Sequence, residues 1–194
     1  MNIFACDIDP WVAALFVLWW RHIVKMPLEA VQILYAAHAV CGGLPDDAPA
    51  NAYKPTHRHH PCVLWAAESK ENYLWLVDHA EALCGRYRWY LEHRQAEDVA
   101  AGKPASRQTK VRDHACLGHI PWLRAHVPAC KQTQRTPFPV VIAPEELVRV
   151  GVYGPGGQLD VCATYAKYIE PKHAEARAQR RREAASKKSS KKLH

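Results

Sequence analysis

The sequence lacks the segments that would place it in a membrane or an oxidising compartment. Its longest apolar run, Trp11 to Trp20, covers ten residues, half of the ~20 that a helix needs to cross a bilayer. Asp7 and Asp9 precede this run, where a secretory signal would have basic residues. The seven cysteines are odd in number and scattered, and none forms a C-x-x-C pair. We therefore expect reduced thiols, a cytoplasmic protein and no membrane partner.

Several enzyme motifs are missing as well. The chain has no G-x-S-x-G, no H-E-x-x-H and no P-loop, which argues against an α/β-hydrolase, a zinc protease of that type and a P-loop NTPase. The glycine-rich stretch GVYGPGGQ at 151–158 lacks the Lys and Ser or Thr that follow in a P-loop, so it indicates a turn. A Cys–His nucleophilic pair stays open, although no local signature supports one. No cofactor is implied.

Four potential metal ligands lie close together in and after the loop predicted at 42–61, namely His57, His59, His60 and Cys62. Their spacing is too tight for all four to bind one ion, and no second ligand pair has a suitable spacing. We therefore predict no metal site. The alternative is that Lys54, His57 and His60 donate to phosphate or base edges at the mouth of a pocket.

The net charge of +7 is confined to the C-terminal end. Residues 1–176, which we expect to form one domain, hold 18 basic and 18 acidic residues. Residues 177–194 hold one acid and eight basic residues: Arg177, Arg180, Arg181, Arg182, Lys187, Lys188, Lys191 and Lys192. A flexible basic tail binds polyanions without sequence preference. DNA is the partner that we expect, although composition alone equally allows a solubilising terminus; the oligomeric state is not predicted.

Helix signals predict a mainly α fold, a single compact helical domain with long irregular loops. Asp9 as N-cap and Pro10 at the first position begin a helix expected over 11–25. Pro27 disfavours helical geometry at the residue before it, which predicts a second helix that ends at the glycine pair 42–43. Further helices are expected over 62–94, near 112–126, near 144–150 and from 159 to about 182, with an irregular region over 102–157.

The stretch RHIVKMPLEA at 21–30 places ionisable residues among apolar ones. His22, Lys25 and Glu29 are three and then four residues apart, which puts them on one face of a continuous helix. If the chain bends at the proline, they can still converge across the bend. Gln32 shares the face of Glu29. Because an unpaired buried charge is costly, these groups must be paired, neutral or functional; a paired His and a solvated Lys are the plain alternative to a site.

A second set of residues with helical spacing lies on the helix expected over 62–94. Trp65, Glu68, Asn72, Trp75 and His79 form a polar and aromatic stripe there. Tryptophans are unusual on plain surface, so they suit either burial against another element or stacking on bases.

Three segments within residues 1–90 carry longer motifs. They read MNIF-x-x-D-x-DP, H-[IV]-V-K-M-P-L-E-x-x-Q and YKPTH-x-x-HPC-x-x-W-x-x-E-S-x-x-N-[YF]-x-W-L. Together they resemble a group of short phage and bacterial proteins described as pyrimidine-dimer DNA glycosylase-like. TPF at 136–138, EEL at 145–147 and Tyr165-x-x-Tyr168 are similar to its later landmarks. The motif residues in this chain are Asp7, Asp9, Pro10, His22, Lys25, Glu29, Gln32, Tyr53, Lys54, His57, His60, Cys62, Trp65, Glu68, Asn72 and Trp75.

The resemblance implies a small all-α enzyme that acts on DNA. In the better-understood phage pyrimidine-dimer glycosylases, the N-terminal α-amine attacks the sugar carbon, and a glutamate stabilises the ring-opened sugar and the imine. A histidine precedes that glutamate by seven residues, the separation of His22 and Glu29 here. An α-amine has a pKa of about 8, so about a tenth of it is neutral and nucleophilic at pH 7, and a nearby carboxylate stabilises the cationic sugar.

The sequence departs from that group at two positions, and the first of them bears on the nucleophile. In that group the second residue is small, whereas Asn2 is bulky enough that Met1 should be retained, so the nucleophile would be the Met1 amine, Lys25 or absent. We favour Met1, with the segment NIFACDID folded back over the helix bend; an apolar setting would lower the pKa of Lys25 and make it the alternative. In addition, the position two before His22 is acidic in that group and is Trp20 here.

We therefore expect a DNA glycosylase, with or without a lyase step, that releases or processes a damaged or modified pyrimidine in DNA repair. A phage-type enzyme that modifies DNA bases on the same scaffold and a non-enzymatic DNA-binding accessory protein are the alternatives. The expected catalytic residues are Met1, His22, Lys25 and Glu29. The expected substrate contacts are Asn2, Gln32, Lys54, His57, His60, Trp65, Glu68, Asn72 and Trp75.

Overall fold

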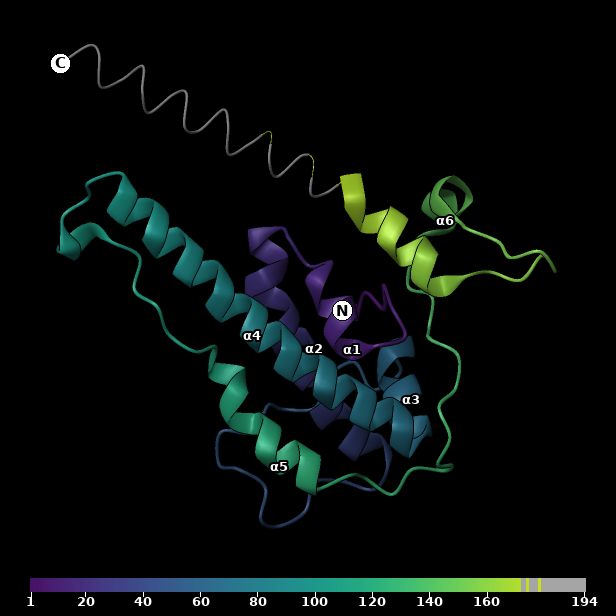
Figure 1. Cartoon of the computed structure of the whole chain (residues 1–194). Helices are drawn as coiled ribbons and strands as arrows, with labels where there is room; N and C mark the ends of the chain where they lie inside the picture. Colours follow the sequence, from purple (N-terminus) through teal and green to yellow (C-terminus); the bar gives the residue numbers. More distant parts are fainter. Residues whose placement is uncertain (172–173, 175–177, 179–194) are drawn as a thin grey trace.

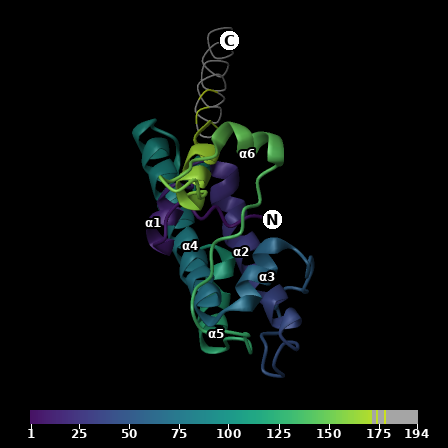
Figure 2. The ribbon, with the colours of Figure 1, turned by 90° about the vertical axis from the view of Figure 1, so that its right-hand side faces the viewer.

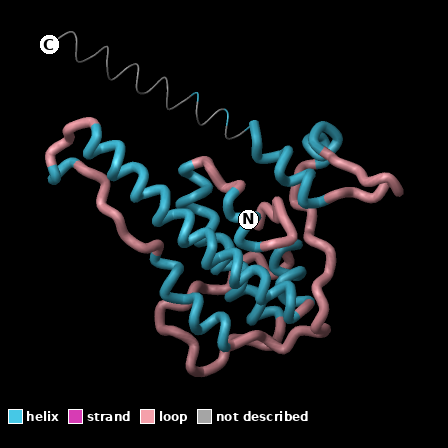
Figure 3. Tube along the Cα trace, in the orientation of Figure 1, coloured by secondary structure: helices cyan, strands magenta, loops and turns pink. Residues whose placement is uncertain are grey.

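The computed structural model describes residues 1–171, 174 and 178, which form helices joined by irregular segments (Figure 1). Among these residues there is no strand, only two isolated bridges (Figure 3). The predicted mainly α fold is thereby confirmed. The helices are α1 (Pro10–Leu15), α2 (Trp20–Val40), α3 (Pro61–Glu68), α4 (Lys70–Ala100), η1 (Ala105–Arg107), η2 (Ala115–His119), α5 (Ile120–Ala125), α6 (Pro144–Val150) and a further helix at 161–171.

The two longest helices, α2 and α4, build the core. They pack against each other, α1 covers α4, and α3 packs against both (Figures 1 and 2). Both helices bury large side chains, including the fully buried Tyr35, Leu34, Tyr73 and Leu76. Within the described part of the chain, no helix is both long and apolar enough to span a membrane.

The first two helices differ from the prediction over 11–25. Asp9 caps α1 as predicted, because its Oδ1 accepts the N–H groups of the first turn at 2.8 and 3.0 Å. However, α1 has only six residues, and α2 begins at Trp20 and continues through Pro27. The predicted break at Pro27 is wrong. This proline is buried in the core, and the packing of that face offsets the missing N–H donor.

The helix predicted over 62–94 is two helices separated by Ser69. Its backbone is extended, with φ −138° and ψ 143°. A segment far along the chain pairs with the break: the Lys70 N–H donates to the Gln132 carbonyl at 3.0 Å, and the Gln132 N–H donates to the Glu68 carbonyl at 3.2 Å. The second helix, α4, also continues to Ala100, beyond the predicted end.

Residues 126–143 connect α5 to α6 without helical structure and run past α3 toward the N-terminus (Figures 1 and 2). Tyr165, in the helix at 161–171, fixes the end of this segment. Its hydroxyl accepts the Val141 N–H at 2.8 Å and donates to the Pro139 carbonyl at 3.0 Å. The segment therefore brings the last described helix beside the first residues of the chain.

The short helices predicted near 112–126 and 144–150 are present as η2 with α5 and as α6. The predicted helix from 159 begins at 161. Its predicted end near 182 and the basic tail at 177–194 lie outside the described residues, apart from single positions.

Candidate active site

A buried carboxylate lies in the middle of α2. Glu29 is 7% exposed, and each of its oxygens faces a donor. Oε2 accepts the backbone N–H of Asn2 at 2.9 Å, and Oε1 lies 2.8 Å from the Nζ atom of Lys25, one turn earlier on the same helix. The hydrogen bond and the ion pair offset the cost of burying this charge.

The first residues of the chain fold back onto α2, as predicted (Figure 2). The Asn2 side chain shapes this turn, because its Oδ1 accepts the N–H groups of Ile3 at 2.8 Å and Phe4 at 3.1 Å. Its Nδ2 donates to the Val141 carbonyl at 2.9 Å. Since Asn2 bonds directly to Glu29, the α-amine of the preceding Met1 lies one residue away from this hydrogen bond, and its charge acts on the same two residues as the Glu29 charge, His60 and Cys62.

His60 approaches this cluster from the other side. It is the N-cap of α3, where its Nδ1 accepts the Cys62 N–H at 3.2 Å. Burial lowers the pKa of His60, and the positive charge of the N-terminal amine lowers it further, while the Glu29 charge and a hydrogen bond to the Met1 backbone act in the opposite direction. His60, the α-amine and Glu29 therefore form one electrostatic cluster.

Cys62 lies beside the same cluster but is not prepared for nucleophilic attack. The side chain is fully buried, and burial raises the pKa of its thiol to about 12 even though the N-terminal charge acts to lower it. The neutral thiol is a poor nucleophile. A Cys–His catalytic pair made of Cys62 and His60 is therefore disfavoured.

Three further predicted residues lie on α2 around Glu29. His22 packs between the rings of Trp19 and Phe4, with centroid distances of 4.6 and 5.0 Å. It lies two turns before Glu29, about 10 Å along the helix. Gln32 is half-buried. The side chain of Lys25 is 67% exposed, so the apolar setting that would have made Lys25 the alternative nucleophile is not present, and the exposure matches the solvated lysine of the plain alternative.

The loop before α3 contributes residues to the rim. Lys54 and His57 are exposed, and the His57 charge is close enough to lower the pKa of His60. Among the described residues, no group of three or more His, Cys, Asp or Glu side chains is arranged to hold a metal ion. His60 instead caps α3.

The stripe on α3 and α4 does not join Glu29. Asn72 is fully buried; its Nδ2 donates to the Trp65 carbonyl at 2.8 Å and to Thr136 Oγ1 at 2.7 Å, and its Oδ1 accepts the Thr136 N–H at 2.9 Å. Thr136 Oγ1 also donates to Glu68 at 2.8 Å. Trp65 and Trp75 are each 5% exposed and pack on Phe138. These residues anchor the 126–143 segment, and of the two predicted roles for the tryptophans the structure favours burial.

Sequence reasoning missed the partners that come from this segment. Val141 supplies a backbone carbonyl to Asn2, and Thr136 supplies three groups to the stripe. A carbonyl leaves no signal in a sequence. TPF at 136–138 was a landmark of the resemblance, but nothing in its residue types names Asn72 as the partner.

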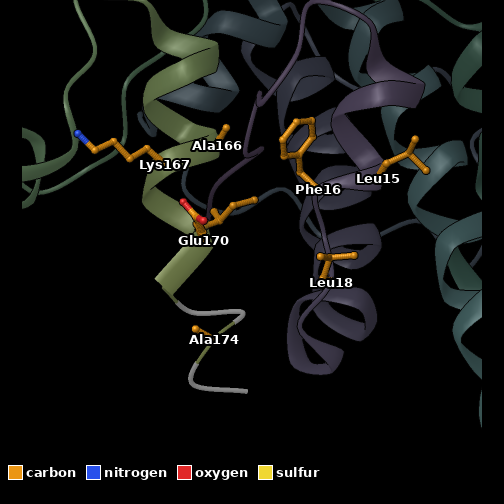
Figure 4. A pocket seen from close by; sticks show the side chains of 8 residues that line it. Leu15, Phe16, Leu18, Ala166, Lys167, Glu170 and Ala174 are labelled. Atoms are coloured by element: carbon orange, nitrogen blue, oxygen red, sulfur yellow. The ribbon is translucent and has the colours of Figure 1, made fainter. Parts of the chain in front are cut away.

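A separate hollow of about 610 Å³ lies near the N-terminal turn. In Figure 4, Phe16 and Leu18, from the segment between α1 and α2, face the helix at 161–171 across it. Phe4 lies 6.4 Å from Tyr168 of that helix between ring centroids. The hollow is lined by Leu15, Phe16, Leu18, Ala166, Lys167, Ile169, Glu170 and Ala174.

No protein-family model matches the chain, and no curated protein or solved structure matches it significantly. The basic residues predicted to contact DNA, Arg177 to Lys192, lie outside the described residues.

Proposed function

We propose that the protein is a DNA-acting enzyme that releases or processes a damaged or modified pyrimidine, with the Met1 α-amine as nucleophile and Glu29 as its carboxylate. One observation carries this proposal: the Asn2 N–H bonds to the buried Glu29 carboxylate at 2.9 Å, which brings the residue that carries the α-amine to the neighbourhood of that carboxylate. The resemblance of the N-terminal motifs to pyrimidine-dimer glycosylases suggests the same pair of groups.

The proposed chemistry needs only these groups and the substrate. The neutral amine attacks C1′ of the sugar, the bond from C1′ to the base breaks, and the departing base takes up the proton that the amine nitrogen loses. The nitrogen lone pair then opens the sugar ring at O4′, which takes up a proton from solvent water, and a cationic imine forms. Glu29 stabilises this cation electrostatically. Water hydrolyses the imine, or β-elimination cuts the strand first.

Lys25 has a supporting part in this scheme. Its ammonium group lies 2.8 Å from Glu29 Oε1 and is largely exposed. It is therefore well placed to contact a phosphate or sugar oxygen of DNA while it stays paired with Glu29. Exposed Lys54 and His57 on the loop before α3 and the basic tail would add sequence-independent contacts.

A base-modifying enzyme on the same scaffold is the second candidate. The observation that favours it is the apolar hollow beside the N-terminal turn, which is separate from the Glu29 cluster. A small-molecule donor bound there would be expected to protect Phe16 and Leu18 from solvent. In this case modified DNA would form without a covalent intermediate at the amine.

The proposal is tested by borohydride trapping on duplexes that each carry one modified or damaged pyrimidine. Borohydride reduces an imine to a stable secondary amine, so a glycosylase of this type yields a covalent protein–DNA band and the free base by mass spectrometry. A chemically modified base in the DNA, without a covalent protein–DNA band, favours the second candidate. DNA binding with neither product on any duplex would make the protein a binding accessory.

A further inference from the structure

A strip of large apolar side chains lies at the surface where α1 leads into α2. Its members are between 36% and 59% exposed: Trp11, Val12, Leu15, Phe16, Leu18, Trp20 and Val24. Helical spacing places Trp11 beside Leu15 on α1, and Leu15, Phe16 and Leu18 line one hollow. A half-exposed tryptophan presents roughly 100 Å² to solvent, so the strip as a whole reaches the few hundred Å² at which an apolar patch marks an interaction site.

Two contacts with α4 fix the direction of the strip. Before α1, the Ile8 carbonyl accepts the indole N–H of Trp75 at 2.7 Å. After α1, the Val17 carbonyl accepts the Nε–H of Arg86 at 3.3 Å. Trp75 and Arg86 are eleven residues apart on α4, which corresponds to about 16 Å along the helix axis. The strip therefore has two well-separated ends.

The two ends differ in charge. Asp7 and Asp9 lie at the first end, beside an open hollow that is lined by three carboxylates and one guanidinium group, those of Asp9, Glu71, Asp78 and Arg135. Arg21 and Arg86 lie at the second end, where their Cζ atoms are 5.5 and 3.7 Å from the centroids of tryptophan rings. Within the described part of the chain, these two aspartates and two arginines form no ion pair. Their charges are therefore available to a partner.

The apolar hollow at the second end can accept a side chain. It has a volume of about 610 Å³ and lies between Phe16 and Leu18 on one side and the helix at 161–171 on the other (Figure 4). A matching side chain lies at the first end, because Trp11 is 51% exposed there. Tryptophans that fill a pocket of the partner are among the residues that contribute most to binding in protein interfaces.

We propose that a second copy of the chain covers this strip, with the two α1 helices antiparallel across a two-fold axis. In such an interface one surface must be complementary to itself with its ends exchanged, and the strip meets this condition twice. The exchange places Trp11 of one copy at the apolar hollow of the other, and it places Asp7 and Asp9 opposite Arg21 and Arg86. An apolar centre with a charged rim is typical of homodimer interfaces.

This dimer does not rest on the proposed function. It does bear on the second candidate, because a hollow filled by Trp11 of the other copy leaves no room for a small-molecule donor. The Glu29 cluster is separate from the hollow, so the proposed nucleophile and carboxylate are unaffected by the association.

The test is sedimentation equilibrium of the full chain over a wide range of protein concentration. We expect the wild type to dimerise reversibly. Leu15→Asp places a charge in the strip at a position that is 59% exposed, so it should leave the fold intact and weaken dimerisation at least tenfold. Val148→Asp is the matched control, the same kind of change at a position that is 87% exposed on α6, and should dimerise as the wild type does. Circular dichroism and Tm show whether each variant folds.

Three further variants test the antiparallel arrangement. Trp11→Ala should weaken dimerisation at least tenfold by emptying the hollow of the other copy. Asp9→Asn keeps an N-cap acceptor for α1 but removes the charge, and Arg21→Gln removes the charge at the other end; each should weaken dimerisation several-fold. Because these two groups lie across the interface from each other, the double variant should lose less than the product of the two single effects.

Several outcomes would contradict the proposal. A wild type that stays monomeric at every concentration would overturn it, and so would a dimer that Leu15→Asp does not weaken. Independent effects of Asp9→Asn and Arg21→Gln would overturn the antiparallel arrangement. A monomer whose Leu15→Asp variant loses binding to a DNA duplex, or to vesicles of phosphatidylcholine and phosphatidylglycerol, would assign the strip to that partner instead of a second copy.

Discussion

Two sets of side chains have the same helical spacing, but one lies at the candidate site and the other anchors a distant segment of the chain. His22, Lys25 and Glu29 lie along α2, and the stripe from Trp65 to Trp75 lies along α3 and α4. The α2 set meets the start of the chain, and its buried carboxylate is bonded to Asn2 and Lys25. The stripe meets residues 133–138, which form hydrogen bonds with its amide, carboxylate and indole groups.

The difference shows what helical spacing does and does not determine. Spacing decides which residues share a face, and both faces were predicted. The element that covers the face decides whether its polar groups stay available for chemistry. At Glu29 that element is a two-residue chain end with an amine; at Asn72 it is a segment whose own backbone needs partners.

The largest expected effect comes from the α2 set. Glu29→Gln keeps the volume and removes the charge, so the Asn2 N–H keeps an acceptor while the cationic imine loses its stabilising carboxylate. We expect adduct formation to fall by about 10²–10³-fold at an unchanged Tm. The measurement is single-turnover trapping beside thermal unfolding. Full activity in this variant would remove Glu29 from the mechanism.

For the stripe we expect a loss of stability with little change in activity. Asn72→Ala leaves the Thr136 N–H and the Trp65 carbonyl without their buried partner, which should lower the free energy of unfolding by about 2–3 kcal/mol. Trapping per folded molecule should stay within about twofold of the wild type. Urea unfolding gives the first value, with Glu68→Gln, at the exposed end of the same network, as a milder control. A selective loss of trapping in a stable Asn72→Ala protein would show that the stripe belongs to the substrate site.

Only part of the fold and of the candidate site could be predicted from the sequence. The helical class, the Asp9 cap and the shared face of Lys25 and Glu29 follow from local rules. The break at Ser69 and the anchoring of Asn72 do not, because their partners are about 60 residues away in the chain. Pro27 was misjudged for a related reason: its burial in the core outweighs the local preference against a proline inside a helix.

Acid should affect the scaffold through buried histidines. Burial lowers the pKa of His38 and of His79 to about 4. Both are neutral in either state above pH 6.5. As the pH falls from 6.5 to 4, only the unfolded chain gains protons at these sites, so stability is lost through this window, by up to about 1.4 kcal/mol per pH unit for each group. Urea unfolding at pH 7, 6 and 5 measures this loss; a flat profile would contradict it, and exposed His59→Asn should leave the slope unchanged.

The basic tail should affect the affinity for DNA but not the rate of the reaction. Deleting residues 177–194 removes up to eight phosphate contacts, so the dependence of log Kd on log salt should flatten by a slope of up to about 7. At physiological salt we expect weaker binding and an unchanged trapping rate at saturating DNA. Binding titrations at several salt concentrations measure the slope. An unchanged slope would mean that the tail does not touch DNA.

The central claim is that the amine beside Glu29 belongs to Met1, and the direct measurement is to locate the trapped DNA on the chain. We expect mass spectrometry of the borohydride-reduced adduct to place the sugar remnant on the Met1 α-nitrogen. The adduct should survive Lys25→Gln with less than a tenfold loss in rate and disappear when the N-terminus is acetylated. A remnant on the Lys25 side chain, lost in Lys25→Gln and retained after acetylation, would contradict the account.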